Sequence, residues 1–148
     1  MKIVIQRVSR AEVRVEGRVV GKIGQGLLLL VAIERGDDAV ILDTFADKVV
    51  NLRIFSDAAG KMNRSSLDAG TALLAVSQFT LAGSLERGRR PSFVNAAPPE
   101  EARPLFDAFV EKLRGHGLEV ATGHFRAMME VELINDGPVT FVLEGAKR

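Results

Sequence analysis

A short polar segment, Ser77-Gln78-Phe79-Thr80, carries side chains that could take part in chemistry. It follows an apolar run and brings two hydroxyls and an amide to the edge of an expected core. A hydroxyl acts as a nucleophile only when a base activates it, and the segment contains no such base. Taken alone, Ser77 and Thr80 are better explained as side chains that satisfy backbone groups at a strand end.

A cluster of arginines follows this segment at once. Arg87, Arg89 and Arg90 lie in the stretch SLERGRRPSF, next to the same strand end. They can form a phosphate-binding patch, which would position a nucleic acid without reading its bases. The alternative is an ordinary solvated loop.

The stretch LINDGPVTFVLEG interrupts good strand residues with four turn formers, Asn135-Asp136-Gly137-Pro138. On local grounds this pattern favours a hairpin turn between two strands. The Gly137-Pro138 pair has properties that an ordinary turn does not require. Gly137 is unhindered and Pro138 has no N–H, so the pair can aim two carbonyl oxygens in one direction.

The usual catalytic patterns are absent from the sequence. Its two histidines, His116 and His124, are best explained as exposed residues near a helix end and on a surface strand. No nucleophile elbow, zinc-protease, EF-hand or phosphate-loop pattern occurs, so neither a metal nor another cofactor is expected. The chain has no cysteine, which excludes disulfides and thiol nucleophiles and is compatible with the cytosol.

The elements that must position these residues follow from hydrophobic spacing. Alternation predicts a hairpin that turns at Glu16-Gly17, and glycines bound a buried strand at 27–33. Helical spacing predicts one helix capped by Asp37-Asp38 and another that opens at Pro99, with Pro104 shortening or bending it. Further strands are expected at 51–55, 71–81, 118–121, 127–134 and 139–143, and a long loop at 82–98. This order predicts an α+β fold with largely antiparallel sheets.

The composition predicts one soluble domain that spans residues 1–148. Hydrophobic residues make up 47% and charged residues 26% of the chain, which is typical of a globular protein. The formal net charge is only +1, so any contact with nucleic acid must be local. The charged start and the short apolar runs predict neither a signal peptide nor a membrane span, and a cytoplasmic location is expected.

Taken together, these segments resemble the D-aminoacyl-tRNA deacylases of the bacterial and eukaryotic type. The resemblance starts at IQRVSRAEVRVEG, continues through RIFSDAAGKMN and SQFTLAGSLERGRRPSF, and ends at NDGPVTF. It implies a homodimer with a compact, β-barrel-like α+β fold and two main helices, whose sites lie at the subunit interface. The implied activity is hydrolysis of the ester between a D-amino acid, or glycine, and tRNA. No DNA or membrane partner is implied.

The resemblance also assigns roles to residues. Ser77, Gln78, Phe79 and Thr80 match the motif that lines the family's catalytic site, and Gly137-Pro138 matches its cis Gly-Pro pair, which enters the site of the other subunit. Arg7 would help to hold that pair. Backbone N–H groups at Phe79 and Thr80 would form an oxyanion hole, with the substrate's 2′-hydroxyl activating water.

Two alternatives stay open at this point. Thr80 could act as the nucleophile, although no base is placed in the sequence to activate it. The chain could also be a binding module that holds D-amino acids or charged tRNA without turnover.

Overall fold

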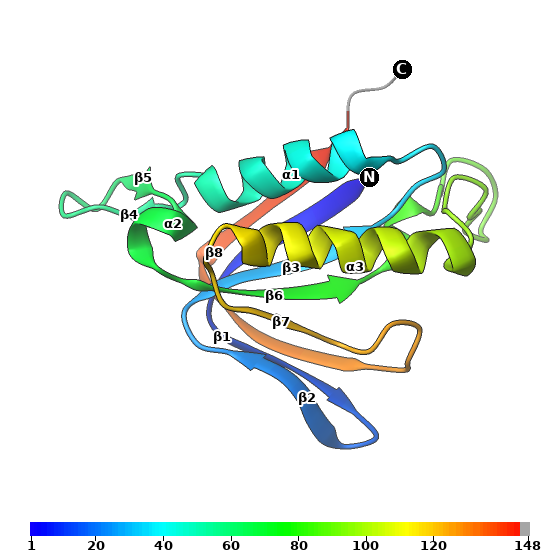
Figure 1. The fold of residues 1–148 in the computed structure, drawn as a ribbon. Helices are drawn as coiled ribbons and strands as arrows, with labels where there is room; N and C mark the ends of the chain where they lie inside the picture. The colour runs from blue at the N-terminus through cyan, green and yellow to red at the C-terminus, as the bar shows by residue number, and fades with distance from the viewer. Residues whose placement is uncertain (146–148) are drawn as a thin grey trace.

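The computed structural model describes residues 1–145 of the chain as helices packed on a strongly curved sheet (Figure 1). The strands are β1 (Lys2–Val15), β2 (Arg18–Ile23), β3 (Gly26–Ala32), β4 (Phe55–Ser56), β5 (Met62–Arg64), β6 (Ala72–Ser77), β7 (Val120–Thr122) and β8 (Glu130–Glu144). The helices are α1 (Ala39–Asn51), α2 (Ser66–Ala69) and α3 (Pro99–Gly115), with a 3-10 helix, η1 (Phe79–Ala82). None of the helices in this described part is long and apolar enough to cross a membrane.

The main sheet has the order β2-β1-β3-β6-β7, and β8 also pairs with β1. The pairs that involve β1 are antiparallel, whereas β3–β6 and β6–β7 are parallel. The sheet curls until β2 approaches β7, where a Cβ on Gly21 would lie 2.2 Å from the Thr122 carbonyl oxygen. A glycine is therefore required at this contact. The expected α+β fold with a barrel-like sheet is confirmed.

Helices α1 and α3 lie side by side over one face of the sheet (Figure 1). Asp38 caps α1 by accepting a hydrogen bond from the Ile41 amide, as its position in the sequence predicts. Helix α3 begins at Pro99 and ends at Gly115, and it runs through Pro104 without being shortened. The buried stripes of both helices pack on β1, β3 and β6 to form the larger core, whose fully buried members include Ile3, Leu29, Leu73, Phe109 and Leu113.

The other face of the sheet closes over a second, smaller core. Val8, Val13, Leu28, Leu74 and Val76 are its main buried residues. Neighbouring residues of β3 and β6, such as Leu73 and Leu74, therefore point into different cores. This two-sided burial explains why the segments at 27–33 and 71–77 read as continuous apolar runs without alternation.

The predicted strand at 71–81 is too long, because β6 ends at Ser77. The Gln78 amide still donates to the Val31 carbonyl, at 2.7 Å, but the Leu81 amide turns back to the Gln78 carbonyl. The chain then forms η1. The chain therefore leaves the edge of the sheet after Ser77. Residues 79–81, which were predicted to extend the strand, form a tight helical turn instead.

The predicted hairpin at Asn135–Pro138 is also wrong, because β8 continues through it as a single strand. On β1 one residue, Arg7, faces the gap between the pairs Val8–Asn135 and Gln6–Thr140. Asp136, Gly137, Pro138 and Val139 fill that gap on β8 as a bulge. The turn formers therefore produce a bulge within the strand instead of a chain reversal, because β8 pairs with β1 both before and after them.

The segment at 51–55 is not the predicted strand, because α1 extends to Asn51 and only Phe55 and Ser56 pair, with β5. The β4–β5 hairpin projects beyond the end of α1 (Figure 1). Helix α2 follows it and begins with a capping box, in which Ser65 and Asp68 bind each other's backbone amides. The Ser65 amide lowers the pKa of the Asp68 carboxyl below its ordinary value.

Candidate active site

The motif Ser77–Thr80 lies where β6 passes into η1. The amides of Phe79 and Thr80 occupy the first two positions of this 3-10 helix, and neither makes a backbone hydrogen bond within residues 1–145. The first N–H groups of a helix have no intrahelical acceptor, so both remain free to bind an oxygen atom. The Thr80 hydroxyl accepts a hydrogen bond from the Gln78 side-chain amide.

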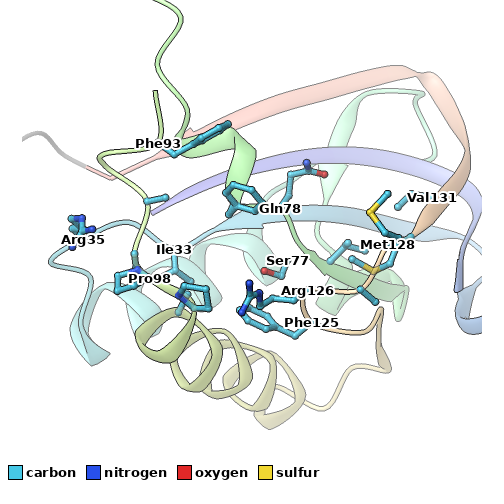
Figure 2. Close-up of a pocket in the computed structure, with 18 residues that line it drawn as sticks. Ile33, Arg35, Ser77, Gln78, Phe93, Pro98, Phe125, Arg126, Met128 and Val131 are labelled. Carbon is cyan, nitrogen blue, oxygen red and sulfur yellow. The ribbon is translucent and has the colours of Figure 1, made fainter. Parts of the chain in front are cut away.

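A cavity of about 700 Å³ opens beside this turn. Ser77, Gln78 and Phe79 form part of its wall, whereas Thr80 does not line it. The remaining wall comes from the end of β3, the segment before α3 and the turn between β7 and β8 (Figure 2). A volume of this size suits a ligand such as an aminoacylated nucleoside.

The wall of the cavity is mostly apolar. Phe79 and Phe93 pack edge to face with their ring centroids 5.2 Å apart, although both are exposed at the surface. The other apolar lining residues are Ile33, Val76, Ala96, Ala97, Pro98, Pro99, Ala102, Phe125, Ala127, Met128, Met129 and Val131. Arg35 and Arg126 supply the charged groups among the lining residues, which include no carboxylate and no histidine. Among the described residues, no side chain that commonly serves as a general base therefore faces the cavity.

The Gly137-Pro138 bulge is held by Arg7 on the neighbouring strand. Arg7 Nε donates to the Asp136 carbonyl at 3.0 Å, and Nη1 donates to the Ile54 carbonyl at 2.8 Å. The peptide bond between Gly137 and Pro138 is cis. Asn135 closes the bulge, because its side-chain oxygen accepts from the Val139 amide at 2.8 Å.

Gly137 is required by the geometry of this bulge. Its φ of +135° lies in the region that glycine alone adopts easily. A Cβ at this position would lie 2.7 Å from Val139 Cγ2 and 3.0 Å from the Val139 amide nitrogen. Any side chain here would displace the bulge.

The structure does not bring all predicted site residues together. Gly137, Pro138 and Arg7 do not line the cavity of their own chain. The arginine cluster, Arg87, Arg89 and Arg90, is exposed in the 82–98 loop, which returns on itself through the Ser84–Ser92 bridge. This loop lines the cavity with Phe93, Ala96, Ala97 and Pro98, and not with its arginines. His116 and His124 lie outside the cavity wall.

Residues 4–144 match the model of the family described as D-Tyr-tRNA(Tyr) deacylase. The chain belongs to this family. The match covers both the Ser77–Thr80 motif and the Gly137-Pro138 bulge, and it confirms the resemblance seen in the sequence.

Named relatives agree with the family assignment. A D-aminoacyl-tRNA deacylase of Pelobacter propionicus is 59% identical over 97% of this chain and 99% of its own length. A protein of the same name from Geotalea uraniireducens is 59% identical over 99% of this chain and 95% of its own length. Both names denote enzymes, so the chain is a member of an enzyme family.

Solved structures agree with the fold. The structure of a c-Myc DNA Unwinding Element Binding Protein matches with a TM-score of 0.94 and 40% identity, over 99% of this chain and 100% of that one. A probable eukaryotic D-amino acid tRNA deacylase matches with a TM-score of 0.82 and 17% identity, over 96% of this chain and 97% of that one. The second likeness concerns the fold alone.

Sequence reasoning missed several residues of the cavity wall. Arg35, Phe93, Phe125, Arg126 and Met128 come from loops with no catalytic pattern. One local signal was available at the β7–β8 turn, where the sequence HFRAMM places three large apolar residues and an arginine in a short connection. Large side chains are unusual in such a turn unless they contact something.

Proposed function

We propose that this protein is a homodimeric D-aminoacyl-tRNA deacylase, which hydrolyses the ester bond of tRNA carrying a D-amino acid or glycine. It would act in the cytoplasm as a proofreading enzyme. The observation that carries this proposal is the family match over residues 4–144, because the matched Ser77-Gln78-Phe79 segment lines a cavity of suitable size. The products would be the free amino acid and tRNA.

The free amides of Phe79 and Thr80 form the oxyanion hole in this proposal. They point from the start of η1 and have no backbone partner in the described chain, so they can stabilise the negative charge that develops on the ester carbonyl. The cavity wall includes no carboxylate or histidine. We therefore assign activation of the water molecule to the 2′-hydroxyl of the substrate's own terminal ribose.

Chiral selection would come from the carbonyl oxygens of Gly137 and Pro138. If these oxygens sit where the side chain of an L-amino acid would point, a Cβ clashes with them and a hydrogen does not. Rejection of this kind works by exclusion, and it leaves glycine as a substrate. Arg7 supports the mechanism, because its hydrogen bond to the Asp136 carbonyl restrains the bulge.

A second copy of the chain is needed for this selection, since Gly137 and Pro138 do not line the cavity of their own chain. Strand β8 suits a dimer contact. It pairs with β1 alone in the described sheet, and it exposes Ile134, Phe141 and Val142, of which Val142 is 62% exposed. An edge strand with such residues favours association.

The tRNA would contact the exposed loop as well as the cavity. Arg87, Arg89 and Arg90 lie on the segment that leads to Phe93, a residue of the cavity wall. Guanidinium groups at these positions can bind backbone phosphates without selecting a base sequence.

Turnover of charged tRNA tests the proposal against a binding module. D-tyrosyl-tRNA is incubated with stoichiometric and with catalytic amounts of protein, and released D-tyrosine is measured. The enzyme should release many equivalents of D-tyrosine per chain and leave L-tyrosyl-tRNA intact. Release that stops at one equivalent, or no release at all, would show a binding module instead.

A further inference from the structure

Arg126 occupies a turn position whose backbone conformation favours glycine or asparagine. It is the third residue of the turn His124–Ala127, which the Ala127 amide closes on the His124 carbonyl at 3.2 Å. Its φ is +64°, a value for which glycine or asparagine is favoured at this turn position. Among the described residues only one other non-glycine residue, Glu16, has a positive φ. An arginine kept in this conformation indicates a use for its side chain.

The turn that carries Arg126 is held against helix α3 by its neighbour Phe125. Phe125 packs near Phe106 of α3, with ring centroids 6.2 Å apart, and the Arg103 guanidinium lies 5.8 Å from the Phe125 ring centroid. These contacts fix the backbone next to Arg126. Arg126 itself is exposed and lines the cavity, and Figure 2 shows it beside Phe125.

A second arginine lies on another part of the same cavity wall. Arg35 Nε donates to the Val94 carbonyl at 2.9 Å, which orients its guanidinium. The acids next to Arg35 have another partner, because the N-terminal ammonium group lies 2.9 Å from both the Glu34 and the Asp37 carboxylates. None of the ion pairs within residues 1–145 involves Arg35 or Arg126.

We propose that Arg126 and Arg35 bind the backbone phosphates of the last nucleotides of the tRNA acceptor strand. This inference rests on the proposed function. If the ester carbonyl is held at the Phe79 and Thr80 amides, the terminal nucleoside fills the apolar cavity. The 5′-phosphate of that nucleoside is one ribose away from the ester, and Arg126 and Arg35 are the cationic groups of the cavity wall that it can meet. Free guanidinium groups bind such phosphates strongly.

Both residues are positioning residues in this proposal, since neither touches the ester. They differ in role from Arg87, Arg89 and Arg90, which do not line the cavity. The cavity arginines would set how deeply the 3′ end enters. Loss of either should therefore weaken binding of the substrate more than it slows the chemical step.

The test is Arg126→Gly, because glycine suits the positive φ and removes only the side chain. Kinetics are measured on D-tyrosyl-tRNA and on 3′-O-D-tyrosyl-adenosine, which has no phosphate. We expect KM for the tRNA substrate to rise about tenfold, with a much smaller rise for the adenosine ester. The salt dependence of log kcat/KM should flatten by about 0.7 when one single-stranded phosphate is no longer bound. Arg126→Lys should restore part of the affinity, and Arg35→Gln should behave like Arg126→Gly.

Glu16→Gly is the matched control, because it places glycine at the other positive φ, in the β1–β2 turn. It should match the wild-type protein in both KM values. Equal KM rises on the two substrates, or an unchanged KM and salt slope in Arg126→Gly, would overturn the inference while wild-type turnover still supports the proposed function. If the wild-type protein cleaves neither ester, the proposed function fails and the inference fails with it.

Discussion

Phe79 offers two separable groups to the substrate, its ring in the cavity wall and its amide at the start of η1. Phe79→Pro removes the N–H, and proline is well tolerated at the first position of a helix. We predict that kcat falls by about a hundredfold or more, the usual effect of losing one oxyanion-hole donor. Phe79→Ala removes the ring and keeps the amide, so it should mainly raise KM. Equal kcat values in the two variants would argue against an amide oxyanion hole.

Thr80 contributes its hydroxyl to a hydrogen bond from Gln78 and does not line the cavity. We therefore predict that Thr80→Ala retains kcat to within about tenfold of the wild-type value, measured by single-turnover deacylation of D-tyrosyl-tRNA. The far-ultraviolet circular dichroism and the melting temperature serve as the folding control. A loss of about a thousandfold with the fold intact would instead support a nucleophilic threonine.

At the level of single residues, the sequence pointed to the motif but not to the cavity. Ser77 and Gln78 were recognisable because polar groups end an apolar run. Phe93, Phe125 and Arg126 were not, because they reach the cavity from loops far apart in the chain. Only the tertiary fold brings those loops together.

Among the elements, the 82–98 loop makes a prediction of its own. Replacing Arg87, Arg89 and Arg90 together with alanine should weaken tRNA binding and reduce the salt slope by about 0.7 to 0.9 for each phosphate that is no longer bound. Discrimination between D- and L-tyrosyl-tRNA should stay the same, because the loop does not carry Gly137 or Pro138. Arg18→Ala, on the distant β1–β2 hairpin, controls for the loss of a positive charge outside the loop. An unchanged salt slope in the triple variant would show that the loop is only solvated.

Both main helices were predictable, since each has a clear start signal and a regular buried stripe. Two of the strand predictions that failed did so for different physical reasons. Local residue types marked Asn135–Pro138 as a turn, but continued pairing with β1 and the Arg7 hydrogen bonds keep β8 in one piece. At Leu81 apolar character suggested a strand, whereas its amide bonds to the Gln78 carbonyl. Tertiary pairing outweighed local preference in the first case, and a local hydrogen bond ended the strand in the second.

For the whole molecule, the proposed dimer places the cavity and the bulge of each site on different chains. Phe79→Pro damages the cavity, and Gly137→Ala damages the bulge through the 2.7 Å contact with Val139. Phe79→Pro alone should lose most of its activity, and Gly137→Ala should lose most of its activity as well if the displaced bulge obstructs the cavity of the other chain. After random mixing, about half of the dimers are mixed and each holds one intact site, so about a quarter of the wild-type activity should return.

The control for this experiment is the double variant, Phe79→Pro with Gly137→Ala, mixed with wild-type protein. If the site is shared between chains, mixed dimers contain no intact site and the activity of the wild-type chains falls. If each chain carries a complete site, wild-type chains keep their activity in mixed dimers, and the two single variants do not rescue each other. That second pattern would contradict a shared site.

The most direct test of the account is deacylation of glycyl-, D-alanyl- and L-alanyl-tRNA under one set of conditions. Exclusion by the Gly137 and Pro138 carbonyl oxygens predicts that the first two are cleaved and that L-alanyl-tRNA survives. An attractive pocket could not produce this result, since one methyl group in an apolar pocket is worth only about 1–3 kcal/mol. If glycyl-tRNA is as resistant as L-alanyl-tRNA, selection by exclusion is wrong.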